Sequence, residues 1–129
     1  MGFDPSALPG EVLAFLTERH LAMLSTLGPG GRPHVVAVGF TFDPAAGLVR
    51  IITGAASQKA ANARRGGRAA VGQVDGARWL SLEGPVTVTA DPGRVATAVA
   101  AYTARYRPPR ENPTRVAIEI SVERVLGRA

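Results

Sequence analysis

The chain has 129 residues, no cysteine and a formal net charge of +5. This length fits one domain over 1–129, and the lack of cysteine excludes disulfides and thiolate sites. No stretch of about 20 apolar residues and no leader pattern occurs, so we predict no membrane span and a cytoplasmic location. The scattered arginines come without a nucleic-acid-binding motif, so the charge favours an anionic small molecule over nucleic acid.

Alternation of apolar residues is more common in the first half of the chain than helical periodicity. A helix over 8–20 is predicted first, followed by strands over 21–27, 34–42 and 48–53 with turns rich in Gly and Pro between them. In the strand over 34–42, one face carries Val35 followed by the small residues Ala37, Gly39 and Thr41. Such a face would let a flat ring approach the backbone, although a tapered barrel interior explains it equally well.

The second half of the chain continues this pattern. We predict helices over 57–66 and 91–106, and strands over 69–75, 78–90 and 115–122, with a bend or edge at Gly84-Pro85. In total, the sequence predicts about six strands and three helices, and these do not alternate as in βαβ units. The fold class is therefore mainly β (α+β), a small antiparallel barrel, closed or split, that leaves few open edges.

Lys59 is the only lysine beside fourteen arginines. It lies in the first turn of a predicted helix for which Ser57 is a good N-cap. Free N–H groups, the positive end of the helix dipole and an ammonium group together favour an anion, most naturally a phosphate. The alternative is a solvated basic helix on the surface.

Reactive side chains are scarce. His20 and His34 are the only histidines and lack metal-ligand spacing. No nucleophile elbow, recognisable carboxylate pair or Walker loop is present, so we predict neither a catalytic side chain nor a metal ligand. An anion site without reactive groups indicates that a cofactor supplies the chemistry. Trp79 points away from the apolar face of its strand, which fits a ring contact, an interface or simple packing.

Five stretches of the sequence carry a family resemblance. They are 19–27, 33–43, 57–62, 73–84 and 105–110, of which the last two are the more specific. In these stretches the chain resembles the pyridoxamine-phosphate-oxidase-like split β-barrel superfamily. Within it, the chain is most similar to the deazaflavin (coenzyme F-420) dependent branch and its biliverdin reductases. The resemblance implies a six-stranded split barrel and a homodimer with a cofactor site at each side of the interface.

The resemblance also implies roles for particular residues. The phosphate-binding position falls on Ser57, Gln58 and Lys59, completed by Asn62. The ring would lie along the strand from His34, against Ile52, Thr53 and Gly54. The implied cofactor contacts are His34, Val36, Ala37, Val38, Thr53, Gly54, Ser57, Gln58, Lys59, Asn62, Gln73 and Trp79, and the implied substrate contacts are Arg78, Arg107 and Arg110.

The implied reaction is hydride transfer from reduced coenzyme F-420 to the bridging methine of biliverdin, giving bilirubin, with the arginines holding the two propionates. Flavin mononucleotide (FMN) is the alternative cofactor, for which Arg50 or Arg64 would be the second basic residue. A reductase of another conjugated substrate, and a flavin- or haem-binding carrier without turnover, remain open, because a fold alone does not select a function.

Overall fold

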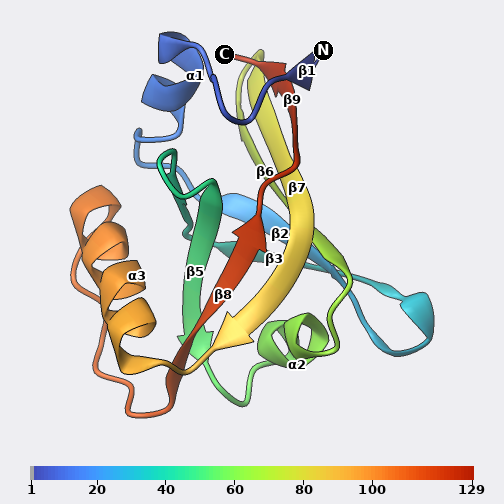
Figure 1. The fold of residues 1–129 in the computed structure, drawn as a ribbon, viewed down its shortest axis with the longest axis vertical. Coiled ribbons are helices and arrows are strands. Elements are labelled where there is room, and N and C mark those ends of the chain that lie inside the picture. Colours follow the sequence, from blue (N-terminus) through green and yellow to red (C-terminus); the bar gives the residue numbers. More distant parts are fainter. Residues whose placement is uncertain (1) are drawn as a thin grey trace.

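The computed structural model describes residues 2–129 and contains nine strands, three α-helices and one 3-10 turn (Figure 1). The elements in chain order are β1 (Gly2–Phe3), α1 (Gly10–Phe15), β2 (Ala22–Leu27), η1 (Pro29–Gly31), β3 (Pro33–Val38), β4 (Thr41–Asp43), β5 (Leu48–Gly54), α2 (Gln58–Arg64), β6 (Arg68–Asp75), β7 (Arg78–Thr89), α3 (Pro92–Arg105), β8 (Arg115–Ser121) and β9 (Arg124–Arg128).

All paired strands are antiparallel, in the order β3-β2-β6-β7-β8-β5-β4, with β9 pairing both β7 and β1. Strand β7 changes partner along its length, from β6 as far as Pro85 to β8 from Val86 onward. A Cβ at Gly84 would lie 1.8 Å from the Ser121 carbonyl oxygen, so only glycine fits this crossing. The bend predicted at Gly84-Pro85 is where the sheet curls into a split barrel, which confirms the predicted fold class.

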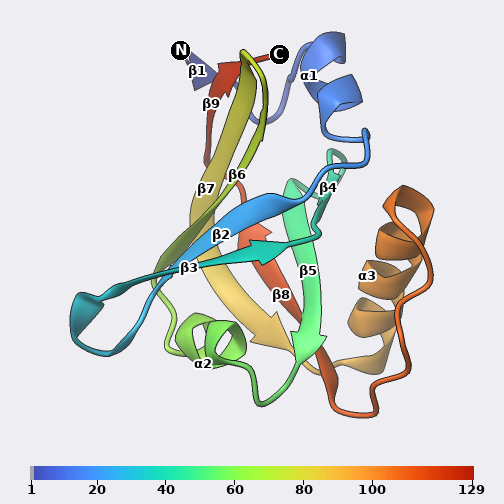
Figure 2. The ribbon, with the colours of Figure 1, turned by 180° about the vertical axis from the view of Figure 1, so that it is seen from behind.

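The core fills the space enclosed by this curled sheet. Its largest fully buried side chains include Phe15 from α1, Phe40, and Leu24 from β2. Helix α3 packs against β5 on one side, while α2 lies against β7 and β2 at the lower end of the barrel (Figures 1 and 2). Arg94 in the first turn of α3 forms an ion pair with the buried Glu119 of β8, which fixes the helix to the sheet. Within residues 2–129, none of the helices is both long and apolar enough to span a bilayer.

Several predicted elements differ from those observed. The strand predicted over 34–42 is interrupted after Val38, and beyond the break Phe40 and Thr41 are both buried, so simple alternation fails there. The first helix ends at Phe15 rather than at residue 20. The prediction of six strands missed β1 and β9, which pair with each other, and counted β3 and β4 as one.

Candidate functional site

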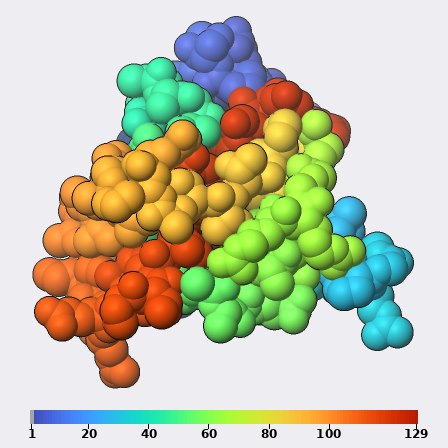
Figure 3. All heavy atoms as spheres, turned by 60° about the horizontal axis from the view of Figure 1, so that its bottom comes forward, coloured from blue at the N-terminus to red at the C-terminus, as the bar shows by residue number. Residues whose placement is uncertain are grey.

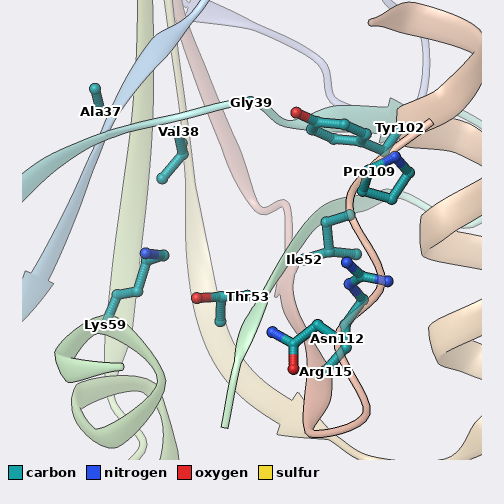
Figure 4. Close-up of a pocket in the computed structure, with 10 residues that line it drawn as sticks. All are labelled: Ala37, Val38, Gly39, Ile52, Thr53, Lys59, Tyr102, Pro109, Asn112 and Arg115. Carbon is teal, nitrogen blue, oxygen red and sulfur yellow. The ribbon is translucent and has the colours of Figure 1, made fainter. Parts of the chain in front are cut away.

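A pocket of about 270 Å³ opens between β3, β5, α2 and the loop that precedes β8. From the end of the barrel where α2 lies, the green atoms of α2 are seen beside the red-orange atoms of that loop (Figure 3). Figure 4 shows the ten lining residues, and we refer to this space as the cationic pocket. They are Ala37, Val38, Gly39, Ile52, Thr53, Lys59, Tyr102, Pro109, Asn112 and Arg115.

Two cations enter the cationic pocket from opposite sides. Lys59 comes from the first turn of α2, and Arg115 comes from the first residue of β8, where it pairs with Gly54 in the strand register (Figure 4). The Arg115 guanidinium also donates a hydrogen bond to the Arg110 carbonyl. Because none of the ten lining residues is acidic, the pocket attracts anions.

The position of Lys59 depends on the polar contacts that hold α2. Thr53 donates from Oγ1 to the Ser57 oxygen at 3.0 Å, and that oxygen accepts the Ala60 amide at 3.2 Å as the helix cap. Asn62 is buried, donates to Thr26 Oγ1 at 3.1 Å and accepts from Gln58 at 2.7 Å. Ser57 and Asn62 thus fix α2 to β5 and β2, and Gln58 supports Asn62, while Lys59 lines the pocket itself.

Tyr102 of α3 forms one wall of the cationic pocket (Figure 4). Its ring lies 4.9 Å from that of Tyr106, measured between centroids. A Cβ at Gly39 would lie 2.9 Å from Cε2 of Tyr102 and 3.1 Å from Cε2 of Tyr106. The break between β3 and β4 therefore allows two tyrosine rings to pack directly on the backbone, which accounts for the glycine.

A partly buried polar network around Arg105 lies next to this break. The Arg105 guanidinium donates to the Phe40 carbonyl at 2.6 Å, to Gln73 Oε1 at 2.5 Å and to the Glu18 carbonyl at 2.9 Å. Gln73 also donates to the Phe15 carbonyl at 2.9 Å. Burial lowers the pKa of Arg105 from its ordinary value. Gln73 is therefore engaged inside the barrel, away from the lining of the cationic pocket.

The other residues implied as cofactor contacts lie around the pocket or farther away. Gly54 ends β5, and Val36 packs against the core. His34 pairs with Thr26 in the strand register, and its buried Nδ1 is without a hydrogen-bond partner in residues 2–129. Trp79, 40% exposed, lies opposite Val74 at the start of β7. Of the twelve, the structure brings Ala37, Val38, Thr53 and Lys59 together in the pocket.

The three arginines implied as substrate contacts fall into two groups. Arg107 and Arg110 line a hollow next to the cationic pocket, with which it shares Tyr102 and Pro109. Arg78 lies elsewhere and forms ion pairs with Glu18 at 2.7 Å and Asp75 at 2.5 Å.

Sequence reasoning missed four of the pocket residues: Tyr102, Pro109, Asn112 and Arg115. In the helix predicted over 91–106, Tyr102 continues the apolar spacing of Val95 and Val99, and in the strand predicted over 115–122 Arg115 alternates with Val116. Both placements are compatible with a pocket wall. Asn112 carries no such signal, because it lies in a loop whose conformation the sequence pattern does not specify.

The fold is an antiparallel split barrel, the fold class of proteins related to pyridoxamine-phosphate oxidase. The family model for pyridoxamine 5'-phosphate oxidase matches residues 8–129, and the chain belongs to this family. It is 59% identical over 122 residues to the F420H2-dependent biliverdin reductase of Mycobacterium tuberculosis (strain CDC 1551 / Oshkosh), covering 95% of this chain and 89% of that protein.

Solved structures agree with this family. A conserved hypothetical protein from Mycobacterium tuberculosis superposes with a TM-score of 0.80 at 26% identity, over 95% of this chain and 84% of that one. A protein described as an F420 reductase superposes with a TM-score of 0.73 at 25% identity, over 93% of this chain and 98% of that one.

Proposed function

We propose that this protein is an oxidoreductase that transfers a hydride from reduced coenzyme F-420 to biliverdin and thereby produces bilirubin. The observation that carries this proposal is the 59% identity, over 95% of the chain, to an F420H2-dependent biliverdin reductase. The cationic pocket supports it independently, because it combines a site for an anion with small side chains beside the backbone of β3. The cytoplasmic location expected from the sequence stays a prediction.

The residues of the cationic pocket fit a phosphate-bearing, flat cofactor. Lys59 and Arg115 would hold the phosphate by charge-assisted hydrogen bonds, since both cations line the same space. The ring would lie along Ala37, Val38 and Gly39. A volume of about 270 Å³ is slightly smaller than that of most ligand pockets, about 300–1,000 Å³, so part of the cofactor would lie on the rim.

Bound reduced F-420 supplies the hydride, and the protein contributes orientation. The Tyr102 wall and the β3 backbone would fix the plane of the ring, and Ile52 would keep water from one side of it. The ten lining residues include neither a carboxylic acid nor a histidine, so water is the proton source in this proposal.

FMN remains the alternative cofactor. Arg50 is held by Asp43 at 2.9 Å, and Arg64 lies in the last turn of α2, away from Lys59. Arg115 nevertheless gives the pocket a second cation. The charge of the pocket therefore suits the phosphate of F-420 as well as that of FMN. The choice of F-420 rests on the sequence identity to the F420H2-dependent biliverdin reductase.

The proposal is tested by turnover. With chemically reduced F-420, the purified protein is expected to convert biliverdin to bilirubin, measured as loss of the red-absorbing band and growth of a blue-absorbing one. A nicotinamide cofactor is expected to give no turnover, because the chain lacks a dinucleotide-binding fingerprint. Parallel titrations with F-420, FMN and haem separate the alternatives. Tight binding of haem or FMN without biliverdin turnover would move the assignment to a carrier or another reductase.

We further infer a homodimer, formed through the outer face of the β3-β2-β6-β7 sheet. Large apolar side chains on this face are 40–68% exposed: Leu21, Met23, Leu27, Val35, Val74 and Trp79. Met23 of β2 is paired with Ala37 of β3, and Ala37 lines the cationic pocket. The apolar face thus adjoins the pocket, and a second copy covering this face would also help to enclose the cofactor.

The dimer proposal predicts a mass of about twice 13.4 kDa in light scattering at micromolar concentration. Val35→Glu is expected to shift this mass to that of the monomer, because it places a carboxylate on the proposed interface. Ala96→Glu, on an exposed position of α3, is the matched control and should leave the mass unchanged. A monomeric wild-type protein that still binds its cofactor would contradict the dimer.

A further inference from the structure

Two surface hollows meet at Tyr102 beside the cationic pocket. The first, the proline hollow, has a volume of about 390 Å³ and is lined by Tyr102, Arg107, Pro108, Pro109 and Arg110. The second, the tyrosine hollow, has about 370 Å³ and is lined by Arg19, Leu21, Tyr102, Tyr106 and Arg107. Tyr102 lines all three spaces and Arg107 lines both hollows, so the cationic pocket and the two hollows adjoin one another.

Each hollow combines apolar surface with two guanidinium groups. In the tyrosine hollow the rings of Tyr102 and Tyr106 provide apolar contacts, and in the proline hollow Pro108 and Pro109 do so. Neither lining contains an acidic residue. This combination suits a flat, conjugated molecule that carries carboxylates, because apolar surface receives the ring system while arginine binds a carboxylate in bidentate fashion.

The arginines of the hollows differ from Arg78 in what they contact. The side chains of Arg19, Arg107 and Arg110 form no ion pair within residues 2–129, and all three residues are exposed. The Arg78 guanidinium contacts Glu18 twice and Asp75 once. It also holds the pKa of the Glu18 carboxyl at about 2, so this pair stays charged at neutral pH.

We propose that Arg19, together with Arg107, binds one carboxylate of the substrate in the tyrosine hollow. Arg110 then binds the second carboxylate in the proline hollow, and the conjugated system lies across Tyr102, next to the cofactor. Arg19 thereby becomes a substrate-specificity residue. It takes the role of substrate contact that the family resemblance had implied for Arg78. This assignment rests on the proposed function, because it takes biliverdin, with its two propionates, as the substrate.

The test compares Arg19→Ala with Arg124→Ala, which removes an equal charge from an exposed position of β9. Biliverdin and its dimethyl ester, which lacks both carboxylates, are the two substrates. With biliverdin, Arg19→Ala is expected to raise KM by roughly threefold to tenfold, the range of one partly exposed guanidinium–carboxylate contact, while kcat changes less than about twofold. With the ester, wild type should have a raised KM, and Arg19→Ala should add little to it.

Direct titration of each variant with biliverdin, without cofactor, separates this inference from the proposed function. Weaker binding by Arg19→Ala than by Arg124→Ala supports the tyrosine hollow even if wild type shows no turnover. If wild type turns over biliverdin and Arg19→Ala behaves as Arg124→Ala does, the role of Arg19 is overturned while the enzymatic function stands. If Arg19→Ala raises KM equally for biliverdin and for the ester, the role of Arg19 is also overturned. The substitution would then have changed the shape of the hollow rather than removed a contact to a carboxylate.

Discussion

Replacing Lys59 by alanine is expected to weaken binding of oxidised F-420 by about 10- to 100-fold. Lys59 lines the cationic pocket from the first turn of α2, and its ammonium group would bind the phosphate of the cofactor. Loss of a charge-assisted hydrogen bond costs roughly 1.5–3 kcal/mol, which gives this range. Titration of the purified variant, followed by the absorbance or fluorescence of the deazaflavin, measures the effect.

Two control variants make the Lys59 result specific. Lys59→Arg keeps a cation at this position and is expected to recover most of the affinity. Arg124→Ala removes the same charge from β9 and should change affinity less than about twofold. The fold should survive all three substitutions, because Lys59 is half-exposed and Arg124 exposed. An unchanged dissociation constant for Lys59→Ala would show that the phosphate does not bind at this lysine.

Elements whose apolar pattern repeats without interruption could be predicted from the sequence. Strands β5 and β6 and helices α2 and α3 were each found within two residues of their predicted ends. The break in the strand over 34–42 could not be predicted, because it accompanies the packing of Tyr102 and Tyr106 on Gly39, a contact between segments far apart in the sequence. Strand β9 was missed because it exists through pairing with β7 and β1, and such long-range pairing is not visible in a five-residue segment.

Site residues could be predicted from the sequence only where the residue type itself was unusual in its local context. Lys59 was conspicuous as the sole lysine after a good N-cap, and the structure has Ser57 capping α2 as expected. Arg115 looks like any alternating strand residue, and only the pairing of β8 with β5 brings it opposite Lys59. Gln73 was implied as a cofactor contact, yet its amide is hydrogen-bonded inside the barrel. This shows that a family motif can also carry a structural contact.

Arg105 illustrates how such a contact supports the pocket from a distance. It contacts none of the lining residues by a hydrogen bond, but it holds the Phe40 carbonyl directly after Gly39. Its guanidinium also lies 4.7 Å from the centre of the Phe40 ring. Tyr106, the next residue, accepts a hydrogen bond from the Phe40 amide at 3.2 Å and donates to the His20 carbonyl at 2.6 Å. The segment that carries Gly39 is thus held by two neighbouring side chains of the same helix end.

Replacing Arg105 by alanine is therefore expected to destabilise the protein by about 2–4 kcal/mol. The substitution removes three charge-assisted hydrogen bonds and leaves Gln73 Oε1, a buried acceptor, without its donor. Urea unfolding at fixed protein concentration measures the effect as a lower midpoint at unchanged slope. Arg128→Ala is the matched control, because Arg128 is exposed and donates one bond to a backbone carbonyl, so its loss should cost less than about 1 kcal/mol. The loosened Phe40 segment should also weaken cofactor binding by Arg105→Ala under conditions where it remains folded. Equal midpoints for the two variants would mean that the buried network contributes no more to stability than an exposed contact.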